Sequence, residues 1–375
     1  MKDNSKNGLK NDIEDTGNSG DKSFVDFLHK KQRELVTSTV DYNLESISQL
    51  INKRTIDLAP KYQRRFRWDD NRKSKLIESF LMNVPIPPIF LNEDDFGKYS
   101  VIDGKQRLSA INEYLTGKLS LSGLEIFTDL NGLNFFDVPL EFQNSLKIRA
   151  NVRAVIILRQ SDKDIKYEVF QRLNTGGVKL NAQEIRNSAF PGKLNDKILE
   201  LSENKFFHSL LGIKSKSKSK IYQEMRDAEL VLRFFALKDS WKNYAGGLKK
   251  ILDSFMDDNQ TMAQTKVDEI AQEFTETLEK VQAIFGADGS FRRWIPENKK
   301  WKQQVSAPLF DAQMFACYKK NKKKLEDSKT KILSDFKKLF TSDKEFLQSI
   351  ESSTATPNRF LYRTNKLNEI LNNNI

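Results

Sequence analysis

The sequence has one cysteine, Cys317, and only two histidines, His29 and His208, among its 375 residues. A single cysteine excludes an internal disulfide framework and any metal site built from several cysteines. Neither histidine lies in a His-x-x-Pro or similar metal-binding context, so we interpret both as ordinary helix residues. No apolar run approaches the ~20 residues that span a bilayer. Residues 1–22 lack the apolar core of a signal peptide, so we expect a disordered tail and a cytoplasmic protein.

Acidic residues are outnumbered by basic ones. The 62 Lys and Arg against 51 Asp and Glu give a formal net charge of +11. This excess favours a polyanionic partner, either a nucleic acid or a nucleotide. A lysine-rich composition with no functional cause explains the charge about equally well. The lysine runs at 214–220 and 319–324 are usually solvated surfaces, although such runs also contact phosphates in a salt-dependent way.

Hydrophobic periodicity divides the chain into two parts. Between residues 23 and 195, helical patterns alternate with short apolar strands, of which 151–159 is the most continuous. Beyond about residue 195 helical patterns continue to the C-terminus, with a loop expected around 286–296. The sequence therefore predicts an α+β fold, with a mixed α/β domain over 23–195 and an all-helical domain over 196–375. Within the first domain, helices are predicted over 44–52, 74–82 and 104–115, and strands over 55–58, 98–102 and the end of 84–93.

A strand, an acid, a glycine and a helix follow one another in VIDGKQRLSAI, residues 101–111. Gly104 permits close approach of the backbone to a ligand, and the first amides of the following helix lack intrahelical partners. A phosphate placed there would meet those amides, the helix dipole and the side chains of Lys105 and Arg107. Asp103 can hold a magnesium ion or orient a water molecule. The alternative is that Asp103 caps the helix while both cations face solvent.

Two further stretches carry candidate binding residues. KYQRRFRWDD, residues 61–70, interleaves arginines with aromatics, a pattern that suits phosphate contact and base stacking. Taken alone, it is about twice as often a loop with solvated arginines and core aromatics. FQRLNTGGVKLNAQEIRN, residues 170–187, offers a Gly-Gly turn, the polar Asn174, and a capping pair of Asn181 and Glu184. On spacing alone, a well-capped helix–turn–helix is the better interpretation of this second stretch.

The order of these stretches resembles a known family. YQRRFRW (62–68), IPPIFL (86–91), VIDGKQRLSAI, FQRLNTGG (170–177) and LNAQEIRN (180–187) follow one another as in the N-terminal domain of GmrSD-type, modification-dependent restriction proteins, within the ParB/sulfiredoxin-like superfamily. The resemblance covers residues 40 to 240. It implies an α/β nucleotide-binding fold, an Asp-Gly-Gln-Gln-Arg motif that supports NTP binding and hydrolysis, and a role against phage by sensing or cutting foreign DNA.

The resemblance also assigns roles to individual residues. Asp103, Gly104, Gln106 and Arg107 match the Asp-Gly-Gln-Gln-Arg motif, with Lys105 in place of its first glutamine, and Gln63 and Arg64 match an earlier polar pair. We therefore expect an NTP, and a magnesium ion on Asp103, with Asp103 and Gln106 acting in catalysis. The expected phosphate contacts are Gly104, Lys105, Arg107, Gln63, Arg64 and Asn174, and the expected DNA contacts are Arg65, Arg67 and Arg72.

The expected function is that of a nucleotide-binding, DNA-engaging protein of a bacterial phage-defence or restriction system. NTP hydrolysis is the expected activity, and DNA nicking is an open second one. Full-length restriction proteins of this type carry a C-terminal His-Asn-His nuclease, which a chain with two histidines is not expected to contain. The main alternative is therefore a non-catalytic nucleotide- or DNA-sensing regulator that acts through a separate partner nuclease. A purely structural DNA-binding module with a vestigial cleft is a third hypothesis.

Overall fold

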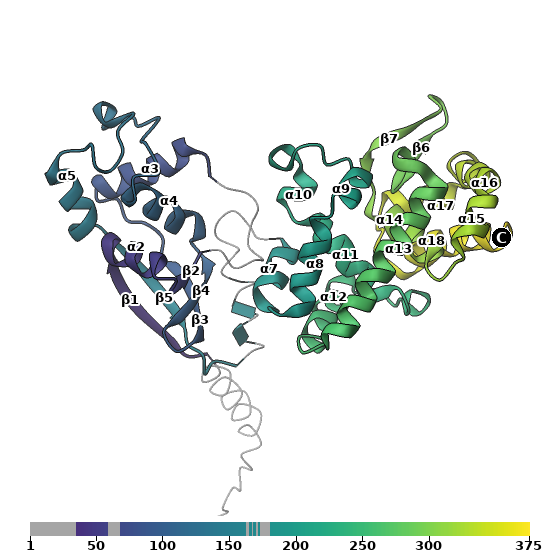
Figure 1. Cartoon of the computed structure of the whole chain (residues 1–375), viewed down its shortest axis with the longest axis horizontal. Coiled ribbons are helices and arrows are strands. Elements are labelled where there is room, and N and C mark those ends of the chain that lie inside the picture. Colours follow the sequence, from purple (N-terminus) through teal and green to yellow (C-terminus); the bar gives the residue numbers. More distant parts are fainter. Residues whose placement is uncertain (1–34, 59–67, 163–164, 167, 170–171, 173–180) are drawn as a thin grey trace, which may run out of the picture.

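The chain forms two lobes, each with its own hydrophobic core (Figure 1). The computed structural model describes residues 35–58, 68–162, 165–166, 168–169, 172 and 181–375. The core of the smaller lobe draws on residues 44–156, and that of the larger lobe on residues 190–371. The fold is α+β, as the sequence predicts, with a sheet in the first lobe and mostly helices in the second.

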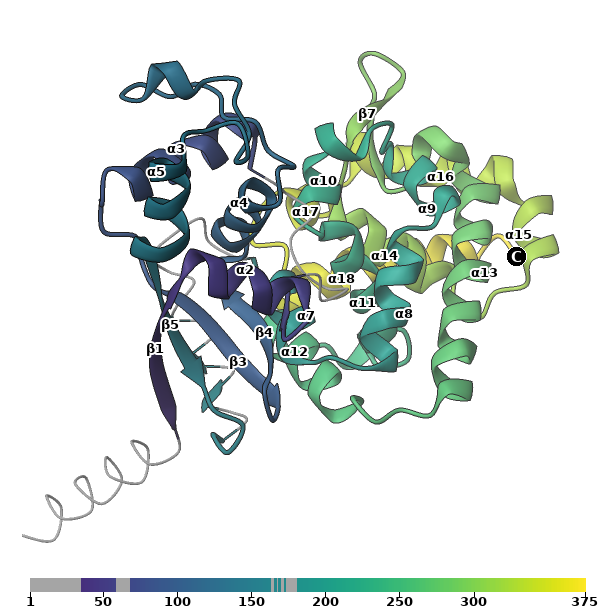
Figure 2. The same cartoon turned by 60° about the vertical axis from the view of Figure 1, so that its left-hand side comes forward.

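The smaller lobe is a five-stranded mixed sheet with helices packed on one face (Figure 2). Its strands are β1 (Thr37–Asn43), β2 (Ile56–Asp57), β3 (Ile89–Asp95), β4 (Lys98–Asp103) and β5 (Asn151–Ile157). They stand in the order β1-β5-β3-β4-β2; β1 is antiparallel to β5 and β3 to β4, whereas the β3–β5 and β2–β4 pairs are parallel. The helices of this lobe are α2 (Leu44–Asn52), α3 (Asp70–Leu81), α4 (Lys105–Leu115) and α5 (Leu140–Asn144).

Alternation along the strands gives the sheet one deeply buried face. Ile89 and Leu91 of β3 and Val101 of β4 belong to the main core of the lobe, together with residues of α2, α3 and α4. Phe90 and Ile102, their neighbours in sequence, belong instead to a small separate cluster. Successive side chains of a strand point to opposite faces, so the helices cover the first face.

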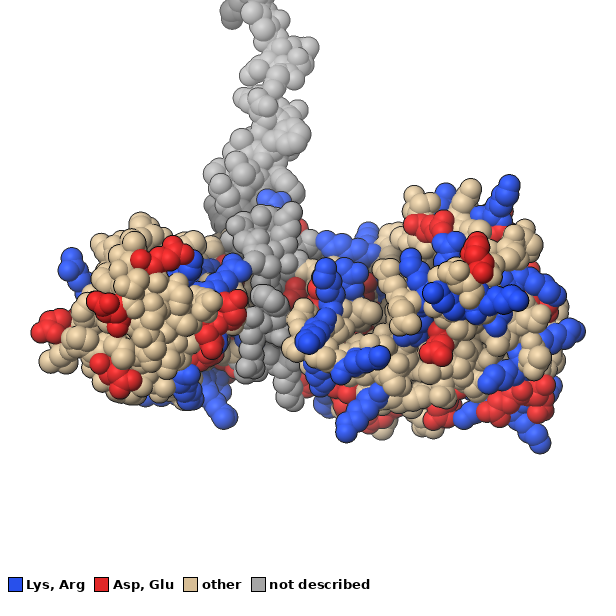
Figure 3. Space-filling model, turned by 90° about the horizontal axis from the view of Figure 1, so that it is seen from above, with Lys and Arg blue, Asp and Glu red and all other residues tan. Residues whose placement is uncertain are grey.

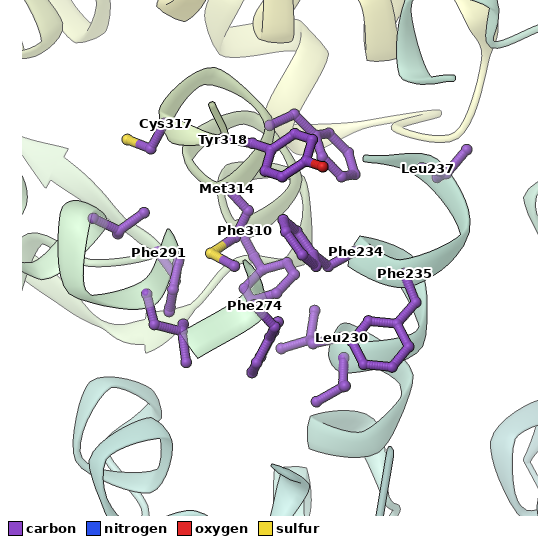
Figure 4. Close-up of a cluster of buried hydrophobic side chains, with 14 of the residues drawn as sticks. Leu230, Phe234, Phe235, Leu237, Phe274, Phe291, Phe310, Met314, Cys317 and Tyr318 are labelled. Atoms are coloured by element: carbon purple, nitrogen blue, oxygen red, sulfur yellow. The ribbon is translucent and has the colours of Figure 1, made fainter. Parts of the chain in front are cut away.

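The larger lobe is mostly helical and is built around its helix α14 (Ala307–Cys317), which is buried along most of its length. It contains α7 (Ala182–Ala189), α8 (Lys193–Ser202), α9 (Lys205–Leu211), α10 (Lys220–Gln223), α11 (Arg226–Leu237), α12 (Leu248–Asp258), α13 (Gln264–Gly289), α14, α15 (Lys322–Asp327), α16 (Lys329–Ser342), α17 (Lys344–Glu351) and α18 (Pro357–Asn372). Every residue of α14 from Leu309 to Cys317 is buried, as expected for a helix at the centre of a core. Figure 4 shows Phe234, Phe274 and Phe310 gathered in this core. The Phe234 and Phe274 rings meet edge to face, with centroids 5.5 Å apart.

Several local predictions are confirmed. The helix predicted over 44–52 has those bounds in α2, and the helix predicted over 104–115 begins one residue later in α4. The strands predicted over 55–58, 98–102 and 151–159 correspond to β2, β4 and β5. The predicted N-terminal tail lies outside the described residues. Among the described helices, none combines the length and apolar composition that crossing a bilayer requires.

The expectation that the second half is entirely helical is wrong at one place. Residues 286–296 were expected to form a loop, but β6 (Arg292–Ile295) pairs antiparallel with β7 (Lys300–Val305). Gly286 kinks the end of α13 with φ +68°, which turns the chain towards this hairpin. Trp294 and Trp301 face each other across the hairpin with ring centroids 5.1 Å apart, and such aromatic pairs stabilise antiparallel strands.

Candidate functional site

The candidate site lies where β4 ends and α4 begins. Gly104 is the N-cap residue of α4, with φ +97°, and no side chain caps the helix. A Cβ atom at this position would lie 2.5 Å from Cγ2 of Ile89 on β3. Both the left-handed backbone and the packing against β3 therefore require glycine here, whether or not a ligand approaches.

Asp103 and Arg107 form an ion pair one helical turn apart. Arg107 Nη2 donates a hydrogen bond to Asp103 Oδ2 at 2.7 Å, and the two side chains are 12% and 43% exposed, respectively. Burial lowers the pKa of the Arg107 guanidinium, and the Asp103 carboxylate offsets part of that effect. The alternative in which Asp103 caps the helix while both cations face solvent is therefore wrong for Asp103 and Arg107.

Arg107 also anchors the proline-rich segment that leads into β3. Its Nη1 donates to the carbonyl oxygen of Pro88 at 3.1 Å and to that of Pro87. Acceptors in the described part of the chain engage three of the five N–H donors of the guanidinium, so its first task is to hold these neighbours.

Gln106 anchors a third segment. Its Oε1 accepts a hydrogen bond from the backbone N–H of Trp68 at 3.0 Å. Trp68 is the last residue of YQRRFRW and packs against the core of the smaller lobe. The exposed Arg72 lies over this ring, with Cζ 4.8 Å from the centroid, a favourable cation–π distance.

Three sequence motifs thus meet at the first turn of α4. Gly104 packs on Ile89, Gln106 holds Trp68, and Arg107 holds Pro87. The motifs lie far apart in sequence, and no pattern within any one of them indicates these contacts. The first turn of α4, which belongs to the motif VIDGKQRLSAI, therefore supports the two other motifs, YQRRFRW and IPPIFL.

A metal ion at the start of α4 would have Asp103 as its protein ligand and would need further ligands from a bound molecule or from water. Among the described residues, no group of three or more His, Cys, Asp or Glu side chains is arranged to hold a metal ion. Asp103 is a half-exposed single carboxylate at the site. One carboxylate suits Mg²⁺ when phosphates and waters fill the remaining positions, which is a common arrangement for this ion.

Other predicted site residues are not brought to this turn by the described structure. Gln63, Arg64, Arg65, Arg67 and Asn174 lie outside the described residues. Of the predicted DNA contacts, Arg72 is described, and it stands exposed near the start of α3.

The stretch LNAQEIRN has a structural role in the larger lobe. Asn181 and Glu184 form the predicted capping box of α7, with Glu184 Oε2 accepting from the Asn181 N–H at 2.8 Å. Arg186 is 1% exposed and pairs with Asp253 at 2.7 Å and Glu229 at 3.3 Å. Of the helix–turn–helix predicted over 170–187, the capped second helix is confirmed, and the turn with Asn174 lies outside the described residues.

The two histidines and the cysteine contribute no site to the described structure. His208 is buried on α9, where its Nε2 lies 2.6 Å from the carbonyl oxygen of Ser202. Cys317 is fully buried on α14, and burial raises the pKa of its thiol to about 12. His29 lies outside the described residues.

Comparison with known proteins identifies the domain that holds the site. Residues 47–191 match the family model described as GmrSD restriction endonuclease, N-terminal domain. No curated protein and no solved structure matches the chain. The chain therefore contains a domain of the GmrSD N-terminal family, as the resemblance of its motifs predicts. The matched region includes all three segments that meet at α4, and the family indicates a protein of a restriction or phage-defence system.

Proposed function

We propose that this protein binds a nucleoside triphosphate at the first turn of α4 and engages DNA as part of a bacterial restriction or phage-defence system. The observation that carries the proposal is the turn itself. Two other family motifs are fixed to it, and its first residues, which no side chain caps, lie beside Asp103 and Lys105. An anion at a helix N-terminus gains hydrogen bonds from the unpaired amides and a favourable interaction with the helix dipole.

The side chains at the turn divide into two kinds. Lys105 is a ligand-binding residue in this proposal: its ammonium group pairs with a phosphate, and the backbone N–H groups of the first turn donate to the oxygens of that phosphate. Arg107 and Gln106 are positioning residues, because their side chains already hold the neighbouring segments. Gln63, Arg64 and Asn174 would complete the phosphate contacts, and Arg65, Arg67 and Arg72 would contact DNA.

Asp103 has a separate role in the proposal. A bound Mg²⁺ would neutralise phosphate charge, with Asp103 as its protein ligand. Without the ion, the same carboxylate can orient a water molecule beside the phosphates. In either role Asp103 remains fixed by Arg107, which holds one of its oxygens at 2.7 Å.

A thermal-shift panel of the four NTPs with Mg²⁺ tests the proposal on the full chain. A ligand present at a hundred times its dissociation constant stabilises the folded state by about 2.7 kcal/mol, and we expect at least one NTP to raise the melting temperature accordingly. Nucleosides without phosphates are the control and should produce no shift. No shift with any NTP would contradict nucleotide binding.

The second candidate function is a switch that binds nucleotide without hydrolysing it. The Asp103–Arg107 pair favours it, because the carboxylate is already partly neutralised. Phosphate release measured under saturating NTP separates the two functions. An NTPase should lose turnover in Asp103→Asn far more than it loses NTP affinity, since the contribution of this residue would be concentrated at the reacting centre. A switch should release little phosphate even as the parent protein.

A further inference from the structure

The larger lobe carries a hairpin, β6–β7, at the edge of the molecule that is uppermost in Figure 1. Figure 2 shows the hairpin projecting from the lobe in a second direction of view. Figure 3 looks down on this edge, and on this face Lys and Arg are concentrated over the larger lobe. The sequence agrees, since residues 181–375 hold 34 Lys and Arg against 26 Asp and Glu.

One face of the hairpin is fixed to the lobe. Trp301 packs against Phe336 of α16, with ring centroids 6.2 Å apart and planes inclined by 24°. Lys337 of α16 covers Trp294, its Nζ lying 3.9 Å from the ring centroid. Because side chains alternate along a strand, Lys300 and Lys302 point away from the face that carries Trp301, and both are exposed.

The base of the hairpin is held by Arg292. This buried side chain donates to four carbonyl oxygens, those of Leu210 at 2.7 Å, Ser290 at 2.9 Å, Ala287 at 3.0 Å and Gln303 at 3.2 Å. The bonds join the ends of α9 and α13 to β7. The hairpin is thus set rigidly on the lobe before any partner arrives.

Arg292 also brings a second lysine-rich segment to the hairpin. A Cβ atom on Gly212 would lie 2.9 Å from Arg292 Nη2, so residues 214–220 begin beside the hairpin base. Figures 1 and 2 both show α10, which starts at the end of that segment, on the same edge of the lobe. We call the outward face of β6–β7, with residues 214–220, the basic ridge.

Several lysines of the basic ridge carry uncompensated charge. In the described part of the chain, no carboxylate forms a salt bridge with Lys299, Lys300 or Lys302. Lys216 pairs with Glu203 at 2.6 Å, and Arg293 pairs with Glu351. The remaining lysines of the segment, Lys214, Lys218 and Lys220, are exposed, and the one acid of the hairpin turn is Glu297.

We propose that the basic ridge binds the phosphate backbone of duplex DNA. A two-stranded β-ribbon fits the major groove of B-DNA, and lysines beside it can contact phosphates without regard to sequence. A rigid, uncompensated array of cations matches a polyanion of high charge density better than it matches a folded acidic protein surface. The inference rests on the proposed engagement of DNA and assigns a surface of the larger lobe to it.

The test compares three full-length proteins in a fluorescence-anisotropy titration with an unmodified duplex. The ridge variant is Lys299→Gln, Lys300→Gln, Lys302→Gln. The matched control is Lys323→Gln, Lys324→Gln, Lys329→Gln, which removes the same charge from exposed positions on α15 and α16. Each variant is first checked for an unchanged circular dichroism melt.

The readout is the dependence of affinity on salt. Three phosphate contacts contribute a slope of about 2.7 to log affinity against log salt, which corresponds to about a 40-fold fall in affinity between 50 and 200 mM salt. We expect the ridge variant to lose most of that component and the control to retain it. Equal slopes and affinities for ridge variant, control and parent overturn the inference while leaving DNA engagement intact. A parent that does not bind the duplex at 50 mM salt overturns both.

Discussion

Replacing Arg107 with alanine tests whether the first turn of α4 supports the motifs that meet there. The substitution removes a guanidinium that is 12% exposed and that donates to Asp103, Pro87 and Pro88. Two carbonyl oxygens next to β3 then lose their donor, and a carboxylate loses its counter-charge. The segment that leads into β3 is no longer tied to α4.

The magnitude follows from these contacts. A hydrogen bond to a charged group contributes about 1.5–3 kcal/mol. The Pro87 and Pro88 parts are smaller than this, because Pro87 is exposed and Pro88 is half-buried, so water can replace the lost donor. The Asp103 part is discounted, because its carboxylate is 43% exposed and water replaces much of the interaction. We expect Arg107→Ala to lower the free energy of unfolding by about 1–3 kcal/mol, summed over the three contacts.

Urea unfolding followed by circular dichroism measures this loss, and hydrogen exchange locates it. Amides of residues 84–92 and 104–115 should exchange faster in the variant, whereas those of α13 should not change. The control is Arg153→Ala, which breaks an exposed ion pair with Asp41 on the same lobe and should leave unfolding unchanged within error. An Arg107→Ala protein as stable as the parent would refute the supporting role of the turn.

Three further predictions concern single residues. Gly104→Ala should lower the free energy of unfolding by about 2–4 kcal/mol in urea titrations, because it strains a left-handed position and drives Cβ into Ile89; an unchanged urea midpoint would contradict the packing of Gly104 on Ile89. Arg186→Met should lower the same quantity by about 3–5 kcal/mol, because Asp253 loses its arginine partner and Glu229 keeps only Arg233. Burial raises the pKa of Glu229, but Arg233 and Arg186 outweigh this effect and lower the pKa below its ordinary value of 4.5. The ionised Glu229 therefore stabilises the fold fully above pH 4.5, and this stabilisation is lost as the pH falls through the lowered pKa. In Arg186→Met the pKa of Glu229 should be lowered less, so urea midpoints measured against pH should show the same loss beginning at a higher pH than in the parent. Cys317 should resist iodoacetamide at pH 8 in the native protein and react fully in urea, as mass spectrometry would show; rapid native labelling would contradict its burial.

Local sequence signals predicted the elements but not the contacts between them. The capping pair Asn181 and Glu184 and the bounds of α2 follow from neighbours in sequence, and both agree with the structure. The bonds from Gln106 to Trp68 and from Arg107 to the prolines join segments about 20 to 40 residues apart, for which no local pattern exists.

Three strands escaped prediction, β1 at the edge of the sheet and the paired β6 and β7, for different physical reasons. β1, with sequence TSTVDYN, lies at the edge of the sheet and has only two apolar side chains, Val40 and Tyr42, so its apolar pattern is weak. β6 is short, and its RRWI sequence resembles the end of a helix unless the cross-strand partner of Trp294 is known. Each of these segments becomes recognisable as a strand only when the strand that pairs with it is known.

The central claim, that NTP phosphates bind at the first turn of α4, is tested most directly by one ratio. It is the dissociation constant of a labelled NTP with Mg²⁺ for Lys105→Ala divided by that for Lys118→Ala, which removes an exposed lysine just beyond the opposite end of the same helix. Loss of a charge-assisted phosphate contact of about 1.5–3 kcal/mol predicts a ratio of about ten to a hundred. A ratio near one, with both variants folded and the parent binding the nucleotide, would place the phosphates elsewhere and contradict the claim.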